Sequence, residues 1–218
     1  MVTQASTGLS DAGVYGMVKS VITSTRHTAR PDSLILHSNT MTDISSGTEF
    51  DINGRLAIGT GRFETATHPR ITRSKFSTAA GSTVSHTGQD FARIGPGSVL
   101  HVEGDFSIGD TYINSHARIM CGEDITIGDG SAISWNFEIL DDDRHQIIVD
   151  GDRPPQTGPV TIEDDVWIGH DVSIHKGVTV HEGSVVASDS VLLEDVPPNT
   201  LVAGSPAEVV REDVEWEW

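Results

Sequence analysis

One stretch of the chain places an aliphatic residue at every sixth position. Between residues 162 and 192 the pattern has no interruption, and its members are Ile162, Ile168, Ile174, Val180, Val186 and Leu192. Four residues after each comes a small or β-branched residue, at Val166, Val172, Val178, Ser184, Ser190 and Val196. This period fits neither an α-helix nor an ordinary strand. It is typical of a β-helix in which each hexad covers one face and turns one corner of a triangular prism.

Three hexads make one coil of such a prism. Residues eighteen apart, such as Ile162 and Val180 or Val172 and Ser190, are therefore expected to stack along the axis. Each coil climbs by about 4.8 Å, the spacing of neighbouring strands. The interior becomes a column of aliphatic side chains, so the chemistry has to lie outside it.

The pattern continues upstream in a less regular form. Steps of six, with a one-residue slip between Ile108 and Ile113, link the following positions: Ile94, Leu100, Phe106; Ile113, Ile119, Ile125; Ile127, Ile133, Ile139. Residues 34–86 contain short, turn-rich segments, with one clear step from Ile52 to Ile58, which predicts degenerate early coils. Residues 64–73 read as a break or a protruding loop.

The ladder breaks between Ile139 and Ile162, which are 23 residues apart rather than a multiple of six. The next position in the frame is His145, and the segment around it is acidic and carries Pro and Gly. We expect an extruded loop over residues 141–159. Loops held by a rigid scaffold are common places for chemistry.

These patterns predict an all-β fold, a single-stranded parallel β-helix over residues 33–206. Residues 1–32 are expected to cap its N-terminal end with a short amphipathic helix around residues 14–22. Residues 207–218 form a C-terminal tail. In this tail we expect a short strand or helix to fold back over the last coil, followed by a surface segment, DVEWEW.

The charge balance limits the range of partners. The 218 residues include 32 Asp plus Glu against 14 Lys plus Arg, a net charge of -18, which argues against nucleic acid and anionic membranes as partners. An acidic excess with only three lysines favours a halophilic protein; an ordinary acidic cytoplasmic protein is the alternative. Cys121 is the only cysteine of the sequence, which fits a reducing compartment such as the cytoplasm. No window holds 18 consecutive apolar residues, so we expect a soluble, cytoplasmic protein without membrane insertion.

Three segments resemble the hexapeptide-repeat acyltransferases, which include galactoside, maltose and polysaccharide O-acetyltransferases. They are NFEILDDDRH (residues 136–145), PVTIEDDVWIGHDVSIHKGVTVHEGSVV (159–186) and DVPPNTLVAGSPAEVVRE (195–212). The resemblance implies a left-handed β-helix that forms a homotrimer, with acetyl-CoA or another acyl-CoA in the groove between neighbouring prisms. It also implies acyl transfer to a hydroxyl of a sugar or polysaccharide, and no metal is expected.

By this resemblance His145 matches the catalytic histidine. Acyl transfer from a thioester to a hydroxyl needs a base, and imidazole has a reference pKa of about 6.5. A neighbouring carboxylate, from Asp141, Asp142 or Asp143, is expected to hold its other ring nitrogen. Trp167 matches a tryptophan of the active-site wall, to which we also assign Asp143 and Gly169.

The same resemblance assigns contacts to the two substrates. Backbone N–H groups at the Gly169 corner are expected to face the thioester carbonyl or the pantetheine arm. His170, Ala187 and Ser188 are the other expected acyl-CoA contacts. Many relatives carry Thr-Lys where this chain has residues 193–194, Leu-Glu, so Arg211 becomes the candidate cation for CoA phosphate. Asn114 is the candidate acceptor contact; a corner or ladder residue is the alternative there.

A competing interpretation uses other histidines. His170 and His175 lie five apart, which resembles the metal pair of γ-class carbonic anhydrases, whose zinc needs three protein ligands. The third histidine of that family would fall near positions 133–136, where this sequence reads ISWN. The transferase is therefore favoured. A non-catalytic scaffold, the remaining alternative, would leave His145 and its loop unexplained.

Overall fold

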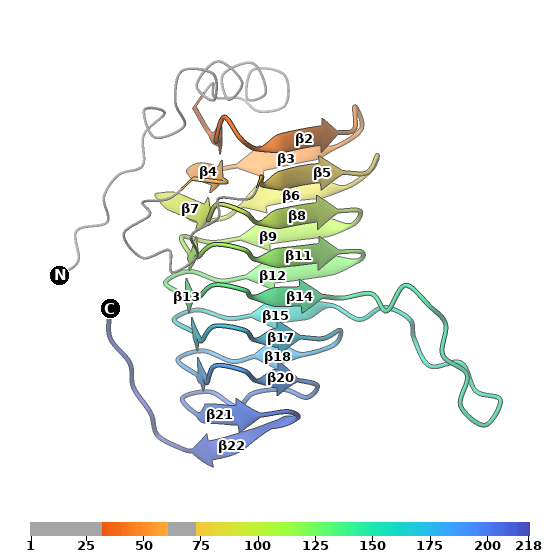
Figure 1. Cartoon of the computed structure of the whole chain (residues 1–218), viewed down its shortest axis with the longest axis vertical. Coiled ribbons are helices and arrows are strands. Elements are labelled where there is room, and N and C mark those ends of the chain that lie inside the picture. The colour runs from red at the N-terminus through yellow and green to blue at the C-terminus, as the bar shows by residue number, and fades with distance from the viewer. Residues whose placement is uncertain (1–31, 61–72) are drawn as a thin grey trace.

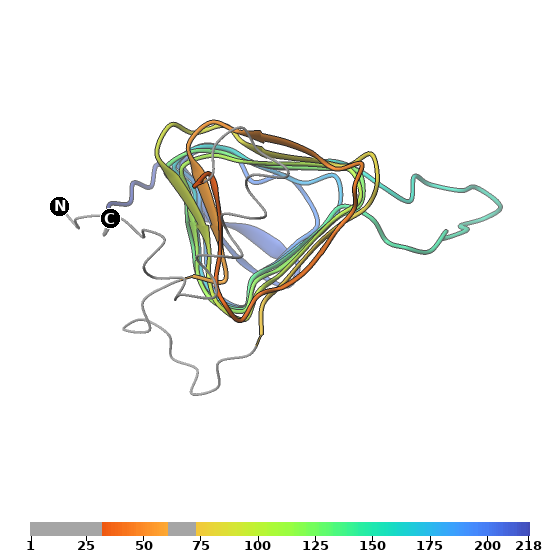
Figure 2. The same cartoon turned by 90° about the horizontal axis from the view of Figure 1, so that it is seen from above.

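The computed structural model describes residues 32–60 and 73–218, which form a triangular column of stacked β-strands (Figure 1). Viewed along the axis, three flat faces meet at three corners (Figure 2). The predicted N-terminal helix and nearly all of the predicted break at 64–73 lie outside the described residues. Within the described part of the chain there is no helix long and apolar enough to cross a membrane.

The strands of the described residues fall into three sheets, one for each face. The nine-stranded face consists of β1 (Leu34–Leu36), β4 (Arg55–Ile58), β7 (Phe91–Ile94), β10 (Tyr112–Ile113), β13 (Ala132–Ile133), β16 (Trp167–Ile168), β19 (Val185–Val186), β21 (Leu201–Gly204) and β22 (Ala207–Arg211). The seven-stranded face consists of β2 (Met41–Ile44), β5 (Lys75–Thr78), β8 (Val99–Val102), β11 (Arg118–Cys121), β14 (Glu138–Leu140), β17 (Ser173–Ile174) and β20 (Val191–Leu192). The six-stranded face consists of β3 (Glu49–Ile52), β6 (Thr83–His86), β9 (Asp105–Ile108), β12 (Asp124–Ile127), β15 (Val160–Ile162) and β18 (Thr179–Val180).

The predicted stacking of residues eighteen apart is confirmed. Ile162 pairs with Val180 across parallel strands, and Ile168 pairs with Val186 in the same way on the next face. Every position of the regular ladder is buried, with at most 1% of its surface exposed. Full burial of such a side chain contributes about 1.5–3 kcal/mol, so the repeated aliphatic position stabilises each coil.

The interior is less uniform than a purely aliphatic column. Phe76, Phe106 and Phe137 are fully buried within it. The early coils that hold Phe76 are longer and less regular than the later ones, with strands of four residues rather than two.

One corner of the prism repeats a left-handed backbone conformation. His116, Asn136, Asp171 and Asp189 follow the nine-stranded face in successive coils, with φ between 56° and 62°. Asn and Asp tolerate this region better than most side chains. The consequence is a stack of polar side chains along this corner, which places Asp171 directly above Asp189.

The C-terminal segment closes the column and then turns back. β22 pairs antiparallel with β21 and so continues the nine-stranded face, as the expected returning strand would. The chain then runs back along that face (Figure 1). The final segment is more than a surface tail, because the indole N–H of Trp216 donates to the carbonyl of Asp165 at 2.6 Å.

Candidate active site

The loop predicted from the break in the ladder leaves the prism where the seven-stranded and six-stranded faces meet. β14 ends at Leu140 and β15 begins at Val160, and the chain between them projects far from the column (Figures 1 and 2). At its base the buried carboxylate of Asp141 accepts backbone N–H groups of Gly122, Glu123 and Asp124 at 2.6–2.8 Å. The foot of the loop is therefore fixed to the coil above.

Two ion pairs hold the next residues of the loop from opposite sides. Arg144 contacts Glu103 of an earlier coil at 2.5 Å. Asp143 contacts the ammonium of Lys176 in the following coil at 2.6 Å, and the same ammonium donates to the carbonyl of Pro155 on the returning strand of the loop. Hydrogen bonds from His101 and from Arg144 lower the pKa of Glu103, so this carboxylate stays charged. The position of residue 145 is thus held from above and below.

His145 follows these anchored residues and is exposed to solvent. Within the described residues its ring has no hydrogen-bond partner. The expectation that a neighbouring aspartate orients it is wrong for the single chain, because each carboxylate is already engaged. Asp141 holds backbone N–H groups, Asp142 accepts from Gln156, and Asp143 pairs with Lys176. The ring is therefore free of contacts from residues 32–60 and 73–218 and is accessible to another molecule.

Trp167 points away from the core, as its place beside the buried Ile168 predicted. It lies on β16 of the nine-stranded face, and 45% of its surface is exposed. Its strand neighbours are Ala132 above and Val185 below. The ring of Trp216 lies 6.2 Å away, centroid to centroid. The outward indole is therefore bordered by the returning C-terminal segment, which the sequence pattern did not reveal.

The corner after Trp167 is closely packed rather than open. A Cβ at Gly169 would lie 2.6 Å from the backbone nitrogen of Ser188, so only glycine fits there. The Gly169 N–H donates to Val186, and the His170 N–H donates to the hydroxyl of Ser188. The expectation that this corner offers N–H groups to a thioester carbonyl is therefore wrong, because the coil below uses them. The N–H of Ala187 is likewise bonded, to Val202.

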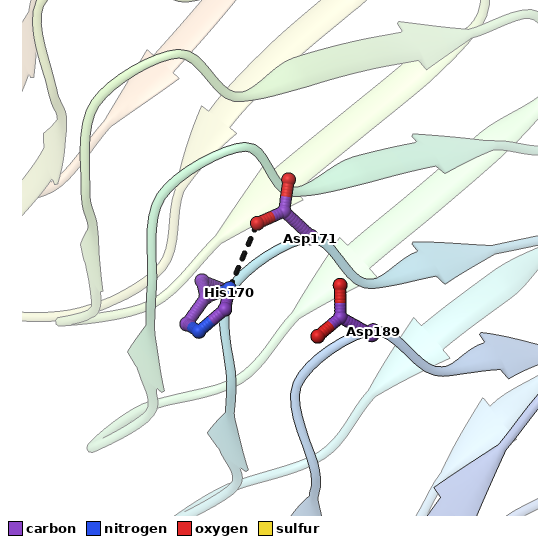
Figure 3. Close-up of side chains that lie close together, drawn as sticks. All are labelled: His170, Asp171 and Asp189. Atoms are coloured by element: carbon purple, nitrogen blue, oxygen red, sulfur yellow. Dashed lines mark hydrogen bonds and ion pairs between the residues drawn. The ribbon is translucent and has the colours of Figure 1, made fainter. Parts of the chain in front are cut away.

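His170 belongs to a polar cluster on the same corner (Figure 3). Its Nδ1 lies 2.8 Å from a carboxylate oxygen of Asp171, and one ligand atom from each of these residues and from Asp189 lies within 4.8 Å of the others. Trp135 stacks flat on the imidazole, with ring centroids 4.8 Å apart. His175 directly follows β17, whereas His170 precedes that strand, so the two histidines lie at different corners. The position at which a carbonic anhydrase would supply its third histidine is thus occupied by the indole of Trp135. The structure therefore gives no support to the zinc site of that family.

Two of the remaining candidates are also placed by the structure. Asn114 is only 9% exposed, and its side-chain oxygen accepts the N–H of Ser115, so it is a corner residue and is poorly placed to contact an acceptor. Arg211 is exposed at the end of β22 and donates to the neighbouring carbonyl of Val210. Its guanidinium remains accessible to an anion from solvent.

The candidate residues form two groups on opposite sides of the prism. His145 and Asp143 lie on the loop that leaves the corner between the seven-stranded and six-stranded faces. Trp167 and the Gly169 corner belong to the nine-stranded face, which is the face opposite that corner (Figure 2). A single chain therefore does not bring the predicted base and the predicted wall together.

Known proteins share both the repeat and the fold. Residues 159–194 match the bacterial transferase hexapeptide family (six repeats). Nodulation protein L of Rhizobium meliloti is 39% identical over 129 residues, which cover 56% of this chain and 70% of the relative. The chain belongs to the hexapeptide-repeat transferase family. The galactoside O-acetyltransferase of Escherichia coli is 34% identical over 119 residues, covering 53% of this chain and 55% of that enzyme.

Other relatives of this hexapeptide-repeat transferase differ in length and in the group they acetylate. The 2,3,4,5-tetrahydropyridine-2,6-dicarboxylate N-acetyltransferase of Halalkalibacterium halodurans is 44% identical over 95 residues, 44% of this chain and 33% of that protein. The chain thus spans half or less of the length of the first curated relatives it matches. A solved structure of the polysialic-acid-specific acetyltransferase NeuO superimposes with a TM-score of 0.55 over 85% of this chain and 89% of that one, at 21% identity. The left-handed β-helix is confirmed.

Proposed function

We propose that this hexapeptide-repeat transferase moves an acetyl group from acetyl-CoA to a hydroxyl of a sugar or polysaccharide, and that it works as a homotrimer. One observation carries the proposal: an exposed, unpartnered histidine at the anchored base of a loop, on the side of the prism opposite the predicted wall. A site that uses both sides requires two copies of the chain. The relative named for transfer to a galactoside supports the choice of acceptor.

In the proposed step His145 removes the proton from the acceptor hydroxyl as its oxygen attacks the thioester carbonyl carbon. The tetrahedral species collapses, the carbon–sulfur bond breaks, and the CoA sulfur leaves and takes a proton. A positioned general base contributes about 10²–10⁴-fold to such a reaction. Holding both substrates in the groove between prisms supplies much of the remaining acceleration.

The second copy is proposed to supply the wall of each site. Trp167 and the Gly169 corner of the neighbouring prism would border the groove, with Ala187 and Ser188 beside them and Arg211 meeting the CoA phosphates. His170 would contact the cofactor from the same corner. The loop tip supports this arrangement, because Ile147, Ile148 and Val149 are each more than half exposed. Consecutive exposed aliphatics of this kind mark a surface that another protein surface covers.

The setting is inferred from composition. Cys121 is a free thiol, which fits a reducing cytoplasm in which acetyl-CoA is available. The net charge of -18 supports adaptation to high salt, where repulsion between surface carboxylates is screened within about 3 Å at 1 M. We expect unfolding to occur at a higher temperature in concentrated KCl than in dilute buffer.

The function is tested by following free thiol release from acetyl-CoA with a panel of sugar, polysaccharide and amine acceptors. His145→Ala is expected to lower turnover by at least about 100-fold while light scattering still reports a trimer. The matched control is His37→Ala, a histidine in the turn after β1, outside the loop and outside both proposed sites. Wild-type turnover in the His145 variant would refute the mechanism, and turnover on amines alone would refute the O-acetyl assignment.

The shared site has its own test, in which two inactive variants are mixed. In a trimer assembled at random from His145→Ala and Trp167→Ala chains, about one quarter of the interfaces combine a wild-type histidine with a wild-type tryptophan. Activity should therefore reappear on co-expression of the two variants. If each site lies within one chain, the mixture stays as inactive as its components.

A further inference from the structure

The C-terminal segment builds a pocket at the corner where the six-stranded and nine-stranded faces meet, and none of the predicted site residues lines it. Val214 donates its N–H to the carbonyl of Asn199, and Trp216 is tied to Asp165 by its indole N–H. Between the segment and the column lies a pocket of about 360 Å³, bordered by Glu182, Asn199 and Trp216 among other residues. Pockets that hold small molecules start at about 300 Å³, so this one has room for a ligand.

Aromatic rings form one side of this region. Trp216 lies between two other indoles, with Trp167 at 6.2 Å and Trp218 at 5.7 Å, centroid to centroid. Trp218 also lines the pocket, and 62% of its surface is exposed. The ring N–H of Trp216 is used by Asp165, so what these indoles offer a ligand is mainly their flat apolar faces. Such faces suit a ligand that is itself apolar on one side and polar around its rim.

The other side of the pocket is polar and acidic. Glu182, Glu215 and the amide of Asn199 supply hydrogen-bond acceptors, and the amide also supplies donors. A Cβ at Gly183 would lie 2.4 Å from the side-chain oxygen of Asn199, so glycine leaves that amide its place in the pocket. Within the described residues no lysine or arginine lines the pocket. Its charge disfavours phosphates and carboxylates, including those of CoA.

These features together point to a sugar. We propose that the pocket between the C-terminal segment and the corner of the six-stranded and nine-stranded faces, walled by Trp216 and Trp218 and lined by Glu182 and Asn199, binds one neutral or amino-sugar unit of the acceptor. A pyranose ring has an apolar C–H face that stacks on an indole and a rim of hydroxyls that donate to carboxylate and amide oxygens. A sialic acid, with its own carboxylate, is disfavoured.

The proposal deepens the proposed function. Sugar binding itself does not depend on that function, but the role of the bound sugar as part of the acceptor does. Trp167 links the two regions, since it belongs to the proposed wall of the transfer site and its ring lies 6.2 Å from that of Trp216, centroid to centroid. A chain of sugars lying across both would have one unit held while another presents its hydroxyl to the base. The pocket therefore predicts a preference for longer acceptors over monosaccharides.

Binding is measured by calorimetry on the full chain without acetyl-CoA, using neutral oligosaccharides, chitosan oligosaccharides, sialic acid oligomers and choline. Neutral or amino-sugar oligomers should bind. Trp216→Ala should weaken that binding by at least 10-fold. Glu182→Ala, which leaves the Trp216 indole in place, should weaken it by at least 10-fold as well. Met41→Ala, an exposed apolar residue on the seven-stranded face, is the control and should leave it unchanged. Tighter binding of sialic acid oligomers or of choline than of the sugars would overturn the proposal.

Transfer assays separate this proposal from the proposed function. If acetyl transfer to short sugars persists but no oligosaccharide binding depends on Trp216 or Glu182, the pocket assignment fails and the function stands. If the oligosaccharides bind as expected but no acceptor is acetylated, the function fails and the sugar site stands. Equal turnover by the wild type and the Trp216→Ala variant on long and short acceptors alike would also contradict the pocket assignment.

Discussion

Lys176 and Asp143 form an ion pair 2.6 Å long that ties the loop carrying His145 to the coil below it. The same ammonium donates to the carbonyls of Pro155 and Gln156. One side chain therefore holds both strands of the loop at once. The loop leaves the column between β14 and β15, so its orientation depends on these few contacts and on Arg144 above them.

Replacing Lys176 by methionine should lower kcat/KM without unfolding the protein. The variant keeps the length and apolar part of the side chain but removes the ammonium, so residue 145 loses its lower anchor. A displacement of about 1 Å at a reacting group can reduce the rate by up to about 100-fold, and we expect a loss of at least 10-fold. The control is Lys75→Met, an exposed lysine of β5. A loss confined to thermal stability would contradict the positioning role.

Asp141 is expected to matter for stability rather than for chemistry. Its carboxylate is fully buried and satisfies three backbone N–H groups, so Asp141→Ala leaves those donors without a partner. A lost hydrogen bond to a charged group costs about 1.5–3 kcal/mol, and water can replace part of it at these half-buried or exposed residues, so we expect the free energy of unfolding in urea to fall by about 2 kcal/mol. Asp51→Ala, on the exposed side of β3, should stay within about 0.5 kcal/mol of wild type. Equal losses in the two variants would refute this role.

The column itself could be predicted from the sequence because its cause is local and repeated. Each buried aliphatic from Ile162 to Leu192 reflects the same requirement of the interior, and the regular period makes the pattern visible in one dimension. Trp167 could be placed outward for the same reason, since it neighbours a ladder position. The irregular gap between Ile139 and Ile162 likewise revealed the loop, because residues that break the six-residue repeat have to leave the prism.

The partners of the loop residues could not be predicted, because they come from other coils. Asp141 to Asp143 look like equivalent neighbours of His145, but one meets backbone donors of an earlier coil and another meets Lys176 of a later one. The contact between Trp216 and Asp165 joins residues 51 positions apart. No period in the sequence records such contacts. The proposed meeting of His145 with Trp167 could not be predicted from the pattern of one chain either, because it would require a second copy.

A buried histidine makes the early coils sensitive to acid. His86 is fully buried, its Nδ1 accepts the N–H of Gly54 at 3.1 Å, and its Nε2 lies 3.0 Å from a carboxylate oxygen of Asp110. With Nδ1 accepting, the neutral ring donates through Nε2. Burial lowers the pKa of His86 below 6.5, and the nearby Asp110 offsets this only in part.

The sign of the pH dependence follows from the lowered pKa. Below pH 6.5 the unfolded chain binds a proton at His86 more readily than the folded one. The stability contributed by His86 is therefore fully present above pH 6.5 and is lost as the pH falls toward the folded pKa. In His86→Gln, where an amide can replace both hydrogen bonds, the urea midpoint should fall less over this range. An unchanged slope in the His86 variant would contradict the prediction.

The lone cysteine should be inert in the folded protein. Cys121 on β11 is completely buried, and its S–H donates to the carbonyl of Asp105 at 3.2 Å. Burial, with a further contribution from the carboxylate of Asp141, raises the pKa of the thiol to about 12. Because the thiolate is the reactive form, the native protein should react with a disulfide reagent at least 100-fold more slowly than the urea-unfolded chain. Val210→Cys, at an exposed position of β22, supplies the reactive comparison in the native state. Rapid labelling of Cys121 in the folded wild type would contradict the prediction and would mean that the column opens at β11. Slow labelling allows thiol release from acetyl-CoA to be followed without a background signal from the protein.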